Sequence, residues 1–82
     1  MITKNIRFNS IKEAVDFVNA ASRQPYNVDL SRGIYNVDAK SILGVLALGL
    51  GNIIRMEIHA DEKDYDYLHG ASQEFMKYQV EC

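Results

Sequence analysis

The sequence has few of the residues that cross-link, break or anchor a chain. Its 82 residues include one cysteine, one proline and no tryptophan. The cysteine is Cys82, the last residue, so an internal disulfide cannot form, and this favours a reducing compartment. No apolar run approaches the ~20 residues that a membrane-spanning helix needs, and the first residues do not have the composition of a signal peptide. We therefore expect a cytoplasmic protein without a membrane segment.

The sequence also has no excess of positive charge. Nine Lys and Arg residues oppose eleven Asp and Glu residues, giving a net charge of −2, and the basic residues are scattered. This distribution argues against nucleic acid and anionic membranes as partners. The two histidines, His59 and His69, do not have metal-site spacing, and the acidic stretch 61–66 lacks the pattern of a calcium loop. We expect no metal and no cofactor.

What the chain does contain is regular hydrophobic periodicity in a single unit spanning residues 1–82, without repeats or linkers. Alternation of apolar and polar residues predicts short strands, and apolar residues at helical spacing predict helices. The predicted strands cover residues 2–8, 26–30, 34–37 and 54–60, and the predicted helices cover residues 11–22, 42–48 and 64–80.

Two serines mark the expected helix starts. Ser10 is followed three residues later by Glu13, which is the capping-box pattern, and Ser41 directly precedes a short apolar segment. The predicted apolar stripe of the first helix consists of Ile11, Ala14, Val15, Val18 and Ala21. The order β-α-β-β-α-β-α predicts an α+β open-faced sandwich, in which three helices cover one face of a four-stranded antiparallel sheet.

The segment from Val37 to Gly49 carries a more specific signal. Its Lys40-Ser41-Ile42 leads into an apolar helix that ends in Leu48-Gly49. This segment, together with the element order, resembles the HPr family, the phosphocarrier proteins of the bacterial sugar phosphotransferase system. The resemblance implies a regulatory serine at Ser41 and protein partners, namely phosphotransferase-system enzymes, an HPr-type kinase or a transcriptional regulator.

The sequence departs from that family at the start of the first helix. Phosphate-carrying members have a Gly-x-His-x-Arg-Pro stretch there, and this chain has Ser10, Lys12 and Glu13 at the positions of the histidine, arginine and proline. Phosphohistidine donates its phosphoryl group readily because its P–N bond is labile, whereas a serine phosphate is a stable ester. A serine nucleophile also needs an activating base beside it. The residues therefore favour an N-cap at Ser10 over a phosphoryl acceptor.

Ser41 has two compatible roles, as an N-cap and as a phosphorylation site. Phosphorylation adds about −1.5 to −2 charges, which the free N–H groups at a helix start tolerate. The apolar residues that follow suit a docking surface. The candidate partner-binding residues are Ser10, Lys12, Lys40, Ser41, Ile42, Leu43 and Leu46.

Three hypotheses follow from these patterns. The first is a regulatory, protein-binding relative of HPr, a monomer or weak dimer without carrier activity. The second is a divergent phosphotransferase component that carries phosphoryl on Ser10, His59 or His69. The third is a binding module outside sugar transport. We do not expect an enzyme, because no set of nucleophile, base and orienting group is present.

Overall fold

A computed structural model describes residues 2–60 and 78–80 of the chain. The strands are β1 (Ile2–Ile6), β2 (Asn27–Arg32), β3 (Tyr35–Asp38) and β4 (Ile54–His59), and the helices are α1 (Ile11–Ser22) and α2 (Ile42–Ala47). This order confirms the predicted β-α-β-β-α-β succession, with boundaries that differ by one or two residues. No helix within the described residues is long and apolar enough to span a membrane.

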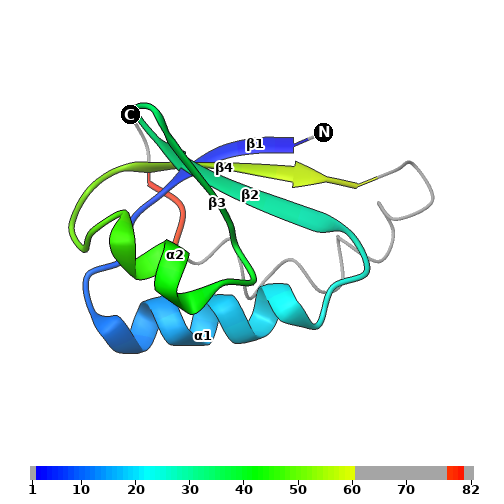
Figure 1. Cartoon of the computed structure of the whole chain (residues 1–82), viewed down its shortest axis with the longest axis horizontal. Coiled ribbons are helices and arrows are strands. Elements are labelled where there is room, and N and C mark those ends of the chain that lie inside the picture. Colours follow the sequence, from blue (N-terminus) through cyan, green and yellow to red (C-terminus); the bar gives the residue numbers. More distant parts are fainter. Residues whose placement is uncertain (1, 61–77, 81–82) are drawn as a thin grey trace.

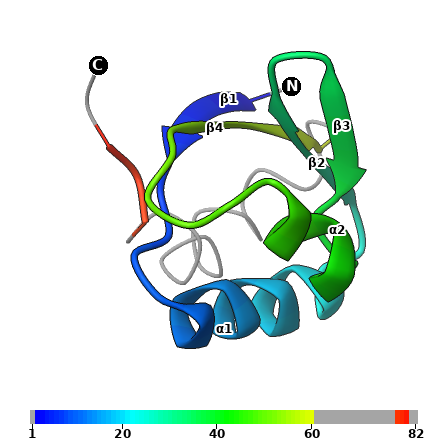
Figure 2. The ribbon, with the colours of Figure 1, turned by 60° about the vertical axis from the view of Figure 1, so that its left-hand side comes forward.

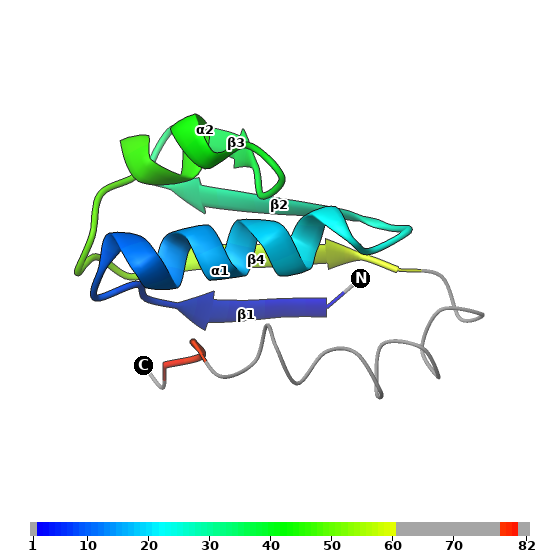
Figure 3. The ribbon, with the colours of Figure 1, turned by 90° about the horizontal axis from the view of Figure 1, so that it is seen from below.

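The four strands form one antiparallel sheet in the order β1-β4-β2-β3 (Figure 1). Both described helices lie against the same face of this sheet, as the view from below shows (Figure 3). The other face is free of helices among these residues. The predicted open-faced α+β sandwich is therefore confirmed, with two helices in the part of the chain that the structure describes.

The core lies between the sheet and α1. Register places Val28 of β2 opposite Ile58 of β4, and Leu30 opposite Met56, and these four side chains are fully buried. Phe17 of α1 is also fully buried, and together with Phe8 and Tyr78 it forms a cluster of three rings whose centroids are 5.0 to 5.9 Å apart. Aromatic burial of this kind stabilises a small domain strongly.

The predicted apolar stripe of α1 is partly wrong. Ala14, Val18 and Ala21 are buried as expected, but Ile11 and Val15 are 59% and 36% exposed. The helix is rolled toward Phe17, which the stripe had omitted, because the phenyl ring buries the largest apolar area by meeting Phe8 and Tyr78. This rotation leaves Ile11 and Val15 at the surface.

The predicted end of the last helix is also wrong. Most of that prediction, residues 64–77, lies outside the described residues. The last three predicted positions, however, are not helical and are bonded to β1 and to the residue after it: Arg7 N donates to Tyr78 O at 3.1 Å, and Val80 N donates to Asn5 O at 2.9 Å. Gln79 forms an isolated antiparallel bridge with Ile6. These residues follow the edge of β1 because its main-chain groups there need partners.

The open face of the sheet carries the polar half of each strand's alternation. Asp29, Glu57 and His59 project from it, and His59 Nε2 lies 2.8 Å from Asp29 Oδ2. The His59 side chain is 40% exposed. His69 lies outside the described residues.

Candidate functional site

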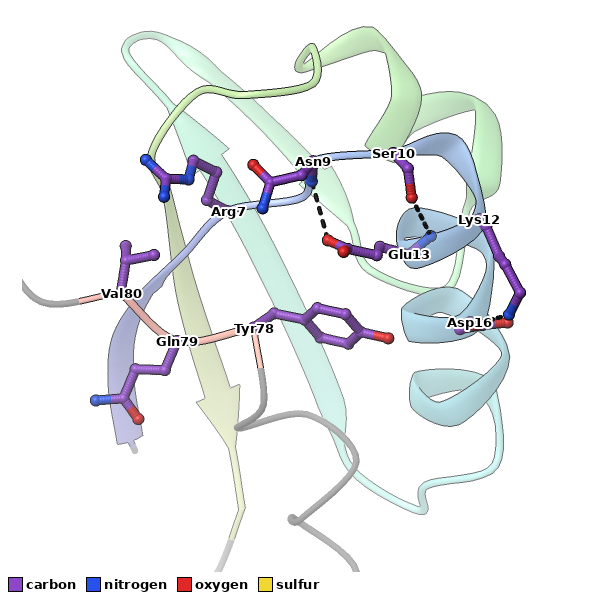
Figure 4. A pocket seen from close by; sticks show the side chains of 9 residues that line it. All are labelled: Arg7, Asn9, Ser10, Lys12, Glu13, Asp16, Tyr78, Gln79 and Val80. Atoms are coloured by element: carbon purple, nitrogen blue, oxygen red, sulfur yellow. Dashed lines mark hydrogen bonds and ion pairs between the residues drawn. The ribbon is translucent and has the colours of Figure 1, made fainter.

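Two hydrogen bonds involving Glu13 stabilise the start of α1. Ser10 has extended backbone angles (φ −150°, ψ 160°), and its Oγ accepts a hydrogen bond from Glu13 N at 3.2 Å. Glu13 Oε1 in turn accepts from Asn9 N at 3.0 Å. The predicted N-cap at Ser10 is confirmed, but the Glu13 carboxylate reaches the N–H of Asn9, the residue before the cap, and not that of Ser10, so the predicted capping box is present in a shifted form (Figure 4).

A cavity of about 600 Å³ lies beside this helix start. Two cations and two carboxylates contribute to its wall, and the side chains are drawn in Figure 4. Its lining residues are Arg7, Asn9, Ser10, Lys12, Glu13, Asp16, Tyr78, Gln79 and Val80.

Lys12, one of the two cations lining this cavity, forms an ion pair with another lining residue. Its Nζ lies 2.8 Å from Asp16 Oδ2, one helical turn along α1. This hydrogen bond, with the charge of Asp16, raises the pKa of Lys12 above its ordinary value. The ammonium group is directed toward Asp16, as Figure 4 shows, while Glu13 is directed toward Asn9. The positive charge of Lys12 is therefore compensated by a neighbouring anion.

The surroundings of Ser10 do not supply an activating base. His59 is on the open face of the sheet and contacts Asp29, whereas α1 covers the opposite face. Among residues 2–60 and 78–80, His, Cys, Asp and Glu side chains form no cluster of three that could hold a metal ion. The geometry at Ser10 supports helix capping, and within the described part of the chain no histidine lies beside Ser10 to act as its base.

The head of α2 is capped in the same way but with different neighbours. Ser41 Oγ accepts from Gly44 N at 3.3 Å, and the first turn contains no acidic residue. The approach to this helix is fixed by Lys40, whose backbone N donates to Asp38 Oδ1 at 2.9 Å and whose Nζ donates to Gln24 O at 3.2 Å. Ser41 itself is exposed.

The structure does not bring the two predicted serines into one site. Lys40, directly before Ser41, reaches Gln24, which follows the end of α1. At the other end of α2, Gly51 N donates to Phe8 O at 2.7 Å, close to the head of α1. The two helices therefore run in opposite directions (Figure 2), and Ser10 and Ser41 lie toward opposite ends of the helical layer.

The exposed apolar residues near the helices only partly match those predicted. Leu43 is 80% exposed, but Ile42 and Leu46 are partly buried and pack against the core. Four further apolar residues are exposed on α1 and in the loop after α2, namely Ile11 (59%), Val15 (36%), Leu50 (41%) and Ile53 (49%). The sequence signal for them was an apolar stripe on α1 too wide to be buried on one side, and two large apolar residues in a glycine-bounded loop. We call Ile11, Val15, Leu43, Leu50 and Ile53 the helix-side apolar surface.

Comparison with known protein structures finds the same architecture. HPr-C-His from Thermoanaerobacter tengcongensis superimposes over 100% of both chains with a TM-score of 0.70 at 24% identity. A phosphocarrier protein HPr from Bacillus anthracis superimposes over 89% of this chain and 94% of its own, with a TM-score of 0.65 at 21% identity. At these identities the likeness establishes the fold.

A third structure is Crh, the catabolite repression containing protein of Bacillus subtilis. It superimposes over 93% of this chain and 88% of its own with a TM-score of 0.58 at 23% identity. That structure is described as an intertwined dimer with a swapped domain.

Comparison by sequence adds the family assignment. No curated protein sequence matches this chain significantly. The family profile described as the PTS HPr component phosphorylation site matches residues 10–77, which is most of the chain. This match agrees with the element order, the antiparallel sheet and the Lys40-Ser41 helix start. The chain therefore belongs to the HPr family of the bacterial phosphotransferase system.

Proposed function

We propose that this chain is a cytoplasmic regulatory protein of the HPr family that binds partner proteins and does not carry phosphoryl groups. Its regulated residue in this proposal is Ser41. The observation that carries the proposal is the capping box at Ser10, which occupies the position of the family's phosphohistidine.

Three features of the α1 head argue against phosphoryl transfer there. The hydroxyl of Ser10 accepts the Glu13 N–H, and the carboxylate of Glu13 places a negative charge where a phosphate would enter. Lys12 is paired with Asp16 and cannot also attract an anion at full strength. A phosphoserine formed there would be a stable ester that does not pass its phosphoryl group on.

The head of α2 has the opposite properties. Ser41 is exposed, and the first turn after it has no carboxylate to repel a phosphate. Leu43, which follows within that turn, offers an apolar contact to an approaching kinase. In the proposal, phosphorylation of Ser41 adds negative charge beside Leu43 and thereby changes which partner the helix-side apolar surface accepts.

The partner classes implied by the family are phosphotransferase-system enzymes, an HPr-type kinase and transcriptional regulators. The helix-side apolar surface supports binding of this kind, because the loop after α2 is bonded to the head of α1 through Gly51 N and Phe8 O, and both segments carry exposed apolar residues. Exposed apolar residues grouped around two helices are typical of protein interaction sites.

The test is incubation with an HPr kinase and ATP, followed by phosphopeptide mass spectrometry. We expect one phosphate on wild-type chain, none on S41A, and an unchanged yield on S10A, which is the matched variant at the other helix cap. Wild-type chain without phosphate on Ser41 would contradict the regulatory part of the proposal.

A parallel incubation with enzyme I and phosphoenolpyruvate tests the carrier part. We expect no acid-labile phosphoryl adduct. An adduct on His59 or His69 that passes to a sugar-specific acceptor would instead establish the second hypothesis, a divergent phosphotransferase component.

A further inference from the structure

The two edge strands of the sheet, β1 and β3, differ in whether another segment bonds to their outer side. The outer edge of β1 is bonded to residues 78–80 through Arg7, Asn5 and Ile6. The outer edge of β3 has no neighbouring strand among the described residues. Natural edge strands are commonly protected by short length, by charged side chains, by Pro or by a bulge. β3 is short and ends in a charged residue, Asp38, but its sequence, Tyr-Asn-Val-Asp, contains no Lys and no Pro.

The backbone of β3 directs specific groups away from the sheet. Ala39 donates its N–H to Val28 O, and in an antiparallel ladder alternate residues bond to the same neighbour. Val37 and Tyr35 therefore bond to β2, whereas the N–H and C=O of Asn36 face outward. An incoming strand would find these groups available for main-chain hydrogen bonds.

The start of β3 adds an apolar contact. Ile34 and Tyr35 are 93% and 66% exposed. Together with Arg32 and Gly33 they line a depression of about 490 Å³ at the hairpin tip. Two large apolar side chains beside an open strand edge are suited to an extended partner.

A row of carboxylates runs across the open face to this edge. Glu57 of β4 lies directly opposite Asp29 of β2, which lies directly opposite Asp38 of β3. Like charges at such positions repel one another. Glu57 forms an ion pair with Arg55 at 3.3 Å, and the carboxylate of Asp29 lies 2.8 Å from His59 Nε2, within hydrogen-bond distance.

Asp38, at the edge, is the unbalanced member of this row. Its Oδ1 accepts the backbone N–H of Lys40 at 2.9 Å, but no cationic side chain within the described residues pairs with it. A Lys or Arg on the next strand position would complete the alternation of charge across the sheet.

We propose that β3 binds an extended basic segment of a partner protein as a fifth, antiparallel strand. A cation of this segment lies opposite Asp38, and an apolar residue three positions later lies opposite Tyr35. A second copy of this chain fits less well, because β3 itself, Tyr-Asn-Val-Asp, contains no cation to place opposite Asp38. This edge is separate from the helix-side apolar surface, so the inference goes beyond the proposed function.

The probe is the peptide acetyl-Thr-Lys-Val-Thr-Val-Thr-amide, titrated into ¹⁵N-labelled full-length chain. We expect saturable amide shifts confined to residues 34–39 and slower hydrogen exchange at Asn36. Replacing the peptide's Lys by Glu, or introducing D38N, weakens binding by about two- to fivefold, the range of an exposed ion pair. D38N retains the acceptor for Lys40 N, and D29N is the matched control, because it removes a carboxylate from the same row away from the edge.

N36P gives the larger effect, because it deletes the outward N–H and abolishes binding; its dispersed amide spectrum reports that it is folded. Three outcomes would overturn the inference: no saturable shift with the Lys peptide, equal affinity of wild-type chain and D38N, or shifts centred on Leu43. Concentration-dependent shifts of residues 34–39 without peptide would also overturn it, since they would mean that a second copy occupies the edge.

Discussion

The heads of α1 and α2 begin alike and differ in what surrounds them. Each has a serine in extended conformation whose Oγ accepts the N–H three residues later, at 3.2 Å for Ser10 and 3.3 Å for Ser41. At α1 the cap is reinforced by Glu13, and the neighbouring lysine is paired with Asp16. At α2 no acidic residue follows, and the helix has six residues compared with twelve in α1.

This comparison shows that a serine at a helix start does not define a function by itself. Both hydroxyls satisfy a backbone N–H that would otherwise be unpaired. The charge of the next turn decides whether a phosphate would be repelled or accommodated. In this chain the cap at Ser10 is reinforced by a carboxylate, while the cap at Ser41 has no acidic residue in the turn that follows.

The largest expected effect tests how firmly each helix is held. F17A should lower the free energy of unfolding by about 3–5 kcal/mol, because it removes the ring by which α1 contacts Phe8 and Tyr78 and leaves a cavity in its place. V45A, which truncates the buried residue of α2, should lower it by about 2 kcal/mol. Urea unfolding followed by circular dichroism measures both. Equal losses would mean that the two helices are anchored with similar strength.

The next effect concerns the reinforced cap. S10A should lower the free energy of unfolding by about 1 kcal/mol, because it removes the Ser10 hydroxyl that accepts the hydrogen bond of Glu13 N. The measurement is again urea unfolding, with S22A near the other end of α1 as a control. A loss no larger than in that control would show that the box contributes nothing to stability.

A smaller effect is expected at the simple cap. S41A should lower the free energy of unfolding by about 0.5 kcal/mol, since only the Gly44 N–H loses a partner and the helix is short. Amide hydrogen exchange at Gly44 and Val45 reports the local loosening. If S41A costs more than S10A, the ranking of the two heads is reversed and the comparison fails.

The smallest effect concerns the ion pair beside the α1 head. The folded-state pKa of Lys12 is raised above its ordinary 10.5 by Asp16, so the pair stabilises the fold below pH 10.5 and the contribution is lost as pH rises through the folded pKa. D16N should lower the pKa of Lys12 toward 10.5, as followed by an NMR titration of its ε-methylene carbon. The urea midpoint at pH 7 should stay within experimental error, because exposed pairs are screened by solvent. An unchanged pKa in D16N would show that Asp16 is not the cause of the shift.

Much of the fold could be predicted because short-range patterns dictate it. Alternation in 54–60 predicted β4 within one residue, and Ser10 with Glu13 predicted the start of α1 together with its hydrogen bonds. Hydrophobic periodicity is less informative about how a helix is rotated about its own axis. The stripe of α1 was placed over Ile11 and Val15, and only contacts with Phe8 and Tyr78, far apart in sequence, turn the helix toward Phe17.

Some features of the candidate site could likewise be predicted from the sequence, and others could not. The prediction that Ser10, Lys12 and Glu13 stand in place of the family's histidine, arginine and proline comes from the sequence alone. The separation of Ser10 from Ser41 is not, because it depends on the antiparallel packing that Lys40 and Gly51 secure. The pairing of Lys12 with Asp16 follows from helical spacing and could have been predicted.

The sequence by itself determined the element order and the helix caps at Ser10 and Ser41, because each depends on residues within a few positions of one another. Only the tertiary structure decided which apolar residues remain exposed, which sheet edge is open, and how the carboxylates of three strands come into one row. Those features depend on the register and packing of segments distant in the chain, and their energies arise only when the segments meet.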